Sequence, residues 1–222
     1  MNDRPAPVDE VQIDVGTGRI IGDLVVPEAA TGVVVFAHGS GSSRHSSRNR
    51  RVAATLHDDD LATLLIDLLT AEEEQVDLRT RELRFDIELL ATRVAAAMDW
   101  LREDERTQQL PVGLFGASTG AAAALVAAAR RPDTVGAIVS RGGRPDLAGS
   151  VLAEVRAPTL LIVGGRDRMV LDLNRTAEAV MVADVEVVVV PGATHLFEEP
   201  GALEQVARLA SGHFSRHLRS LR

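Results

Sequence analysis

Residues 112–120 read VGLFGASTG, an apolar stretch that runs into Ser118 between two glycines. The apolar residues before Gly116 predict a short buried strand, and the alanine-rich residues from Thr119 onward predict a helix. Glycines on both sides of the serine permit a sharp strand-to-helix turn, which holds Ser118 in a strained conformation with its hydroxyl exposed. The N–H of Thr119 then lies at a helix N-terminus, where negative charge is stabilised. The segment predicts an α/β protein with a reactive serine at a strand end.

The same alternation of short β-branched runs and alanine-rich stretches continues on both sides of this segment. It is typical of an α/β fold with a mainly parallel sheet, and Gly16-Thr17-Gly18 predicts an antiparallel hairpin at its start. We expect strands at residues 11–15, 19–26, 32–37, 62–66, 112–115, 135–139, 159–163 and 185–190. We expect helices at residues 47–57, 81–102, 119–131, 172–180 and 203–218.

Most of the predicted strands are apolar throughout, which indicates a sheet with helices on both faces. No repeat or flexible linker divides the sequence, so we expect a single domain over residues 1–222, with residues 1–10 as a loose N-terminal segment. The connection between residues 139 and 158 is too short for a large cap domain. We therefore expect an open, shallow site, unless residues 67–80 fold over it.

Composition excludes several classes of function. The chain has 222 residues with 24 basic and 32 acidic side chains, a net charge of −8, and this balance argues against a nucleic-acid partner. It contains no cysteine, lysine or tyrosine, which excludes disulfides, thiolate metal sites and Schiff-base chemistry. The longest apolar runs are too short to span a membrane, and the N-terminus lacks the pattern of a signal peptide. We expect a cytoplasmic protein without a membrane partner; monomer and homodimer both stay open.

Two downstream residues provide the base and the orienting carboxylate that a reactive serine needs. Asp167 follows the predicted strand 159–163, and His195 follows the predicted strand 185–190. In a parallel sheet both positions fall at the edge that carries Ser118. The order serine, aspartate, histidine along the chain is that of α/β-hydrolases. We predict a catalytic triad of Ser118, Asp167 and His195; the alternatives are a helix-capping aspartate and a loop histidine.

Residues 38–43, HGSGSS, follow the first predicted parallel strand and form a glycine-rich loop. A second oxyanion donor is expected from this loop, and the Ser40 N–H is our candidate beside that of Thr119. His38 is expected to brace the loop rather than to act as a second base. The spacing of a phosphate-binding P-loop is missing, so nucleotide binding is not expected.

Arginines gather near these segments. Arg44 stands beside the glycine-rich loop, and Arg141 and Arg144 follow the predicted strand 135–139. One interpretation is that they attract or clamp an anionic substrate. The alternatives are a solvated first helical turn around Arg44 and an ordinary buried ion pair at the other two. Together with His38, these three arginines are the candidate substrate-binding residues.

Four motifs, HGSGS (38–42), GASTG (116–120), GGRD (164–167) and GATH (192–195), together resemble small α/β-hydrolases of the dienelactone-hydrolase-like group. The resemblance extends over residues 11–218. It implies the α/β-hydrolase fold, with about eight mostly parallel strands, and hydrolysis of an ester-like bond. Ser118 stands where dienelactone hydrolases have cysteine, which favours a carboxylesterase. Related sequences also occur fused to phosphoribosyltransferase domains; we find none here and expect no purine role.

The expected function is hydrolysis of short-chain carboxylic esters or small lactones through an acyl-enzyme on Ser118. The expected partner is a small-molecule ester, and the mechanism requires no metal or organic cofactor. The alternatives are an acyltransferase or perhydrolase with the same triad, and a non-catalytic binding or regulatory module. Two further features receive structural interpretations: His213 and His217 as surface histidines, and residues 72–74 as a solvated helix cap.

Overall fold

The computed structural model describes residues 6–218 of the chain. Its strands are β1 (Asp9–Asp14), β2 (Arg19–Val25), β3 (Gly32–Ala37), β4 (Leu61–Ile66), β5 (Val112–Ala117), β6 (Val135–Arg141), β7 (Thr159–Gly164) and β8 (Val185–Val190). Its helices are α1 (Ser47–Asp58), α2 (Ala71–Thr80), α3 (Ile87–Glu103), α4 (Thr119–Arg130), α5 (Arg168–Val180) and α6 (Ala202–His217), with 3₁₀ segments η1 (Leu83–Phe85) and η2 (Pro145–Glu154). None of the helices in this described range has the length and apolar character needed to cross a membrane.

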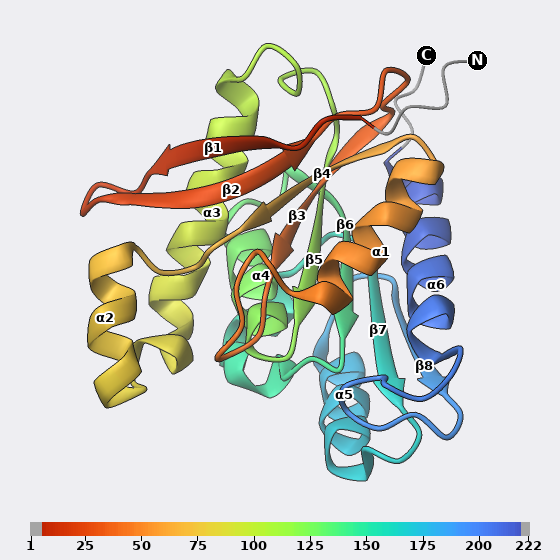
Figure 1. Cartoon of the computed structure of the whole chain (residues 1–222). Helices are drawn as coiled ribbons and strands as arrows, with labels where there is room; N and C mark the ends of the chain where they lie inside the picture. The colour runs from red at the N-terminus through yellow and green to blue at the C-terminus, as the bar shows by residue number, and fades with distance from the viewer. Residues whose placement is uncertain (1–5, 219–222) are drawn as a thin grey trace.

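The eight strands form one sheet in the order β1-β2-β4-β3-β5-β6-β7-β8 (Figure 1). β2 pairs antiparallel with β1 and with β4, and the remaining neighbours are parallel. The predicted fold class, an eight-stranded and mostly parallel sheet that opens antiparallel, is confirmed. In the described residues, the short η2 segment joins β6 to β7, and no large cap domain is inserted there.

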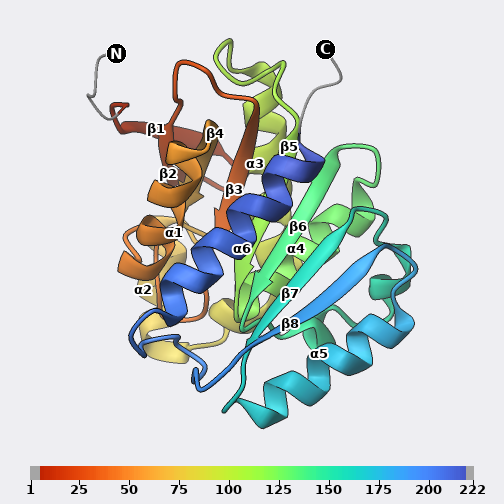
Figure 2. The ribbon, with the colours of Figure 1, turned by 90° about the vertical axis from the view of Figure 1, so that its right-hand side faces the viewer.

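Helices cover both faces of the sheet, as the apolar strands predict. Figure 2 shows α1 and α6 in front of the sheet and α3 and α4 behind it. Alternate residues of β3 therefore pack in different layers: Val33 and Val35 lie in the core under α3 and α4, and Val34 and Phe36 lie in the core under α1 and α6. Burial of apolar surface on two faces is the main stabilising contribution of this architecture.

The order of the strands reverses at β3. The chain passes from β3 to β4 on one side and then returns to β5 on the other, so β3 pairs with both. Ala37, the last residue of β3, pairs with Ile66 of β4 and Gly116 of β5, which brings three carboxyl ends to one edge. Ligands of open α/β sheets bind at such a switch point. This edge is therefore where the site is expected.

The connection between β4 and α3 differs from the prediction. A helix was expected over residues 81–102, but α3 begins at Ile87, and a separate helix, α2, precedes it. Thr70 caps α2 in a reciprocal capping box with Glu73, so residues 72–74 form its first turn. At the N-terminus, β1 begins at Asp9, inside the segment 1–10 that was expected to be loose; residues 1–5 lie outside the described part.

His213 is not the surface residue that the sequence suggested. Its side chain is buried on α6, and one ring nitrogen lies 3.2 Å from the carbonyl oxygen of Pro158. Burial is the largest cause that lowers the pKa of His213, to about 4. His217 follows one turn later and is half-buried. The periodicity of the last helix places His213 on the face that packs against the sheet, together with Phe214.

Glycines that face backbone atoms should tolerate no side chain. A Cβ at Gly120 would lie 2.3 Å from the carbonyl oxygen of Ala37, whereas a Cβ at Gly212, exposed on α6, would meet nothing within 4 Å. We expect Gly120→Ala to lower the free energy of unfolding by about 3 kcal/mol through steric overlap. Gly212→Ala, the matched control, should raise it by about 0.5–1 kcal/mol because alanine favours helices. Urea unfolding measures both; equal effects would contradict the packing described.

The buried His213 should make the protein sensitive to acid. Because its pKa is lowered in the folded state, the unfolded chain binds the proton first, and stability falls as the pH drops from about 6.5 towards 4. We expect this group to account for up to about 3 kcal/mol of that loss. His213→Gln should flatten the dependence, measured by urea unfolding at pH 7 and pH 4.5. His45→Gln, at an exposed histidine, is the control. An unchanged slope in His213→Gln would contradict this assignment.

Candidate active site

The turn from β5 into α4 holds Ser118 in an unusual backbone conformation. Its φ is 51° and its ψ is −119°, outside the regions that L-residues normally occupy. The flanking glycines make this turn possible, because a Cβ at Gly116 would lie 2.3 Å from the Cα of Ala121, and one at Gly120 would overlap the end of β3. This is the strained strand-to-helix turn that the motif predicts.

Backbone hydrogen bonds fix Ser118 from both sides. Its N–H donates to the carbonyl oxygen of Arg141 at 3.3 Å, and its carbonyl oxygen accepts from the N–H groups of Arg144 at 3.2 Å and Ala121 at 3.1 Å. The serine is thereby joined to the end of the neighbouring strand β6. Strain of about 1–3 kcal/mol persists only where the surroundings determine the backbone in this way.

Asp167 and His195 lie together at the same edge. Nδ1 of His195 is 2.6 Å from Oδ2 of Asp167, and the aspartate side chain is 15% exposed against 39% for the histidine. Asp167 ends a tight turn after β7, where its N–H donates to Gly164 at 2.9 Å. The turn contacts the histidine loop directly, since Arg166 donates to the carbonyl oxygen of Ala193 at 2.9 Å. The imidazole is oriented by a largely shielded carboxylate.

Ser118 and His195 lie against two consecutive residues, Arg141 at the end of β6 and Gly142 in the turn that follows. Ser118 bonds to Arg141, and a Cβ built on the next residue, Gly142, would lie 3.5 Å from Cε1 of His195. In the described chain, no hydrogen bond joins the serine hydroxyl to the imidazole. Such contacts are often long without substrate and shorten in the complex. The structure thus pairs Asp167 with His195 directly and brings Ser118 into their vicinity.

The glycine-rich loop after β3 lies against the serine. A Cβ on Gly39 would come within 3.1 Å of the Cβ of Ser118. Among residues 6–218, the Ser40 N–H has no hydrogen-bond partner, and the Thr119 N–H belongs to the first turn of α4, where helical partners are missing. Both amides are therefore available as donors. The side-chain hydroxyl of Thr119, which the sequence did not single out, is also buried without a partner.

A pocket of about 170 Å³ opens beside these donors. Residues 38–42 and Thr119 form one wall, and α2 with η1 forms the opposite wall through Glu74, Asp77, Leu78 and Arg84. The connection after β4 thus does close part of the site, which is less open than its short β6–β7 connection predicted. The sequence did not lead us to predict these wall residues. The pattern T-x-x-E at residues 70–73, a capping box, could have predicted the start of α2.

His38 braces the loop, as expected. Its Nδ1 lies 2.9 Å from the carbonyl oxygen of Gly39, and its Nε2 accepts from the N–H of Leu68 at 3.3 Å. Burial lowers the pKa of His38, which keeps Nε2 free to accept this hydrogen bond. The imidazole therefore connects the glycine-rich loop to the end of β4.

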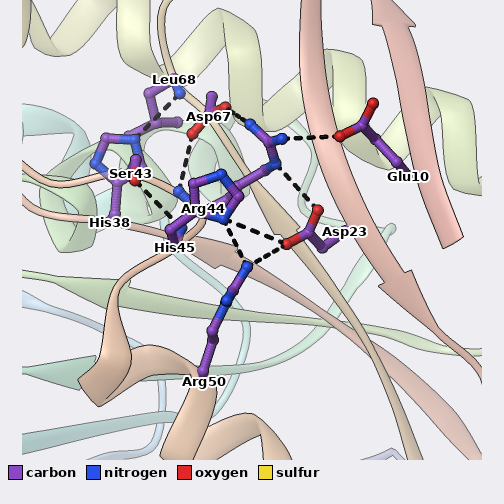
Figure 3. A network of polar contacts seen from close by, with 9 residues as sticks. All are labelled: Glu10, Asp23, His38, Ser43, Arg44, His45, Arg50, Asp67 and Leu68. Carbon is purple, nitrogen blue, oxygen red and sulfur yellow. Dashed lines mark hydrogen bonds and ion pairs between the residues drawn. The ribbon is translucent and has the colours of Figure 1, made fainter. Parts of the chain in front are cut away.

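Arg44 belongs to an internal network instead of the substrate site (Figure 3). Its guanidinium donates to Asp67 at 2.5 Å, Asp23 at 3.0 Å and Glu10 at 2.9 Å, and its own N–H donates to Asp67 at 2.9 Å. Arg50 pairs with Asp23 at 2.9 Å. Three carboxylates already neutralise Arg44, so we withdraw it as a substrate-binding residue. It anchors the glycine-rich loop to β1, β2 and β4.

The other two candidate arginines differ from each other. Arg144 forms an ion pair with Asp146 at 2.7 Å and is not free for a substrate anion. Arg141 is buried, and its guanidinium donates to Asn49 of α1 at 3.3 Å.

Within residues 6–218, no group of three or more His, Cys, Asp or Glu side chains is arranged to hold a metal ion.

Comparisons of sequence identify relatives of this chain. The model of the dienelactone hydrolase family matches residues 21–222. Two proteins of Mycobacterium tuberculosis, from strains CDC 1551 and H37Rv and provisionally named phosphoribosyl transferases, are each 60% identical over 216 residues. The match takes in 97% of this chain but 48% of each relative, so this chain spans about half of their length.

Comparisons of structure agree with the family match. A dienelactone hydrolase from Anabaena variabilis is 59% identical, with a TM-score of 0.95 over 97% of this chain and 100% of that one. Est1E from Butyrivibrio proteoclasticus has a TM-score of 0.78 at 15% identity, over 94% of this chain and 98% of its own. The second likeness supports the fold alone.

The network around Arg44 should hold the glycine-rich loop in place. We expect Asp67→Asn to lower the free energy of unfolding by about 2 kcal/mol, because it leaves a largely buried arginine with one partner fewer. Amide hydrogen exchange of residues 40–46 should also speed up. Glu88→Gln removes an exposed ion pair with Arg130 and should cost less than about 0.5 kcal/mol. Unchanged exchange in Asp67→Asn would show that the loop does not depend on this network.

Proposed function

Because this chain belongs to the dienelactone hydrolase family, we propose that it is a serine hydrolase that cleaves carboxylic esters through an acyl-enzyme on Ser118. The 2.6 Å contact between Asp167 and His195, at the same sheet edge as the strained serine, carries the proposal. The transferase name of the M. tuberculosis relatives describes proteins about twice as long. Residues 21–222 here match a hydrolase family, which supports hydrolysis for this part.

The first half of the reaction acylates the serine. His195 Nε2 accepts the Ser118 proton while Oγ attacks the ester carbon, so a C–O bond forms and the carbonyl electron pair moves to oxygen. Asp167 holds the imidazole in the required tautomer and stabilises its charged form. The bond to the alcohol then breaks, and His195 returns the proton to the leaving oxygen. An acyl-enzyme and a free alcohol result.

The developing oxyanion is bound by the N–H groups of Ser40 and Thr119. Among the described residues 6–218, neither amide donates to a partner that it would have to release, which supports their role as oxyanion donors. Loss of one such donor costs about 3–4 kcal/mol of transition-state stabilisation in comparable sites. In the second half, His195 takes a proton from water, and the water oxygen attacks the acyl carbon. The bond between the acyl carbon and Ser118 Oγ then breaks, His195 returns the proton to Oγ, and the acid leaves.

The dimensions of the adjoining pocket favour small acyl groups. Its volume of about 170 Å³ is below the 300–1,000 Å³ that is usual for drug-sized ligands. The wall from α2 and η1 carries Glu74, Asp77 and Arg84, so only part of the pocket is apolar. Short-chain esters and small lactones fit this description, and long acyl chains do not.

A series of p-nitrophenyl esters from acetate to decanoate tests the nucleophile and the pocket together. We expect the wild type to prefer short chains and Ser118→Ala to lose about 10⁴-fold or more in kcat. Ser150→Ala, at an exposed serine of η2, is the matched control and should retain activity. Folding of each variant is checked by circular dichroism.

Three outcomes would contradict the proposal. Turnover that persists in folded Ser118→Ala excludes this serine as the nucleophile. Wild-type turnover of long esters only would refute the assignment of the small pocket. Acyl transfer to an added alcohol or peroxide that outruns hydrolysis would identify an acyltransferase or perhydrolase instead.

A further inference from the structure

The last strand of the sheet, β8, has a free backbone edge. In the described part of the chain it pairs with β7 alone, and Figure 2 shows it at the end of the sheet. The carbonyl oxygens of Asp184 and Val190 accept from N–H groups of β7 and of the residue that follows β7, so the even-numbered residues of β8 face β7. Because backbone groups alternate in direction along a strand, the N–H and C=O groups of Val185, Val187 and Val189 face away from the sheet. None of these outward groups has a hydrogen-bond partner among residues 6–218.

The side chains along this edge are almost entirely apolar. β8 reads VEVVVV, in which four of the five valines are half-buried and Glu186 is the one charged residue. Val185 packs against the core under α3 and α4, and Val188 packs against the core under α1 and α6. The apolar surface continues at Val180 and Val182, just before the strand, which are 50% and 65% exposed. An exposed apolar edge strand is a template for pairing with another strand.

The opposite edge of the sheet is protected in a way that β8 is not. β1 reads DEVQID, and three of its six residues, Asp9, Glu10 and Asp14, are acidic. Asp9 forms an ion pair with Arg106 at 2.7 Å, and Glu10 forms one with Arg44 at 2.9 Å. Charged side chains on an edge strand discourage pairing between sheets. The chain therefore blocks one edge of its sheet and leaves the other able to accept a strand.

We propose that β8 pairs antiparallel with β8 of a second copy of this chain, which joins the two sheets into one. With a two-fold axis at Val187, this residue faces its own copy, and Val185 faces Val189 of the partner subunit. All the outward backbone groups are then paired, in about six hydrogen bonds, and valines pack against each other across the junction.

Two neighbouring registers are less favourable than this one. An axis at Glu186 would set the two carboxylates directly opposite each other, and like charges in that position are destabilising. An axis at Val188 would leave one hydrogen-bonded pair fewer between the two strands. The register centred on Val187 places Glu186 opposite Val188 of the partner subunit, so the strand is complementary to itself.

Size-exclusion chromatography with light scattering measures the assembly of the whole chain. We expect a particle of twice the 23.7 kDa chain mass at micromolar concentration. Val187→Pro should raise the dissociation constant of the dimer by about a hundredfold or more, because it removes the central N–H donors and places a ring at the axis. The single chain should tolerate this change, since the N–H of Val187 faces away from β7. Glu186→Gln, on the same strand, is the matched control and should dimerise at least as tightly as the wild type.

Amide hydrogen exchange followed by NMR identifies the surface that pairs. The amides of Val185, Val187 and Val189 should exchange more slowly as the protein concentration rises, because the dimer protects them. The amide of Val188, which faces β7, should exchange slowly at every concentration. This alternation between neighbouring residues is specific to pairing through the edge of β8.

A wild type that is monomeric at every concentration, or Val187→Pro that dimerises as tightly as the wild type, would overturn the proposal. A dimer in which the three outward amides exchange at a rate independent of concentration would also overturn it, since that dimer would use another surface. If Val187→Pro fails to fold, Val187→Lys takes its place: it keeps the N–H but sets two like charges opposite each other, and it should be monomeric. Circular dichroism checks folding. These measurements require no ester turnover, so their outcome is independent of the proposed hydrolysis.

Discussion

The positive φ of Ser118 is the constraint on which the rest of the site depends. A serine adopts φ 51° only if its neighbours determine the backbone, and here three backbone hydrogen bonds and two glycines do so. Because Gly120 lies against the carbonyl oxygens of Ala37 and His38, the turn also fixes the distance between α4 and the end of β3. The serine, its oxyanion donors and the strand that follows are positioned by one packing arrangement.

Three of the four buried or partly buried arginines compared here form ion pairs with carboxylates, and one does not. The cations that hold the framework are paired: Arg44 joins three carboxylates around the glycine-rich loop, Arg93 joins Glu73, and Arg144 joins Asp146. These pairs are partly or largely buried, so removal of one partner would leave an uncompensated charge. Arg141 alone among these four lacks a carboxylate. Its guanidinium donates instead to the amide oxygen of Asn49.

The sequence predicted the parts of the structure that follow from local pattern. Residues 32–37 and 185–190 are strands with the expected bounds, because continuous β-branched runs between breakers are unambiguous. The helix α2 was missed, since its stability comes from the Thr70–Glu73 cap and not from an apolar face. The ion pairing of Arg44 and the burial of His213 depend on residues that are distant in sequence, such as Asp67 and Pro158. No local sequence pattern contains that information.

Covalent labelling with a fluorophosphonate tests the central claim most directly, because it reports an activated serine without any assumption about the substrate. The account predicts stoichiometric modification at Ser118, located by peptide mass spectrometry. It also predicts that folded His195→Ala, in which the base is missing, reacts slower by about three orders of magnitude or more. Labelling of a different serine, or equal reactivity of Ser118 with and without the imidazole, would contradict it.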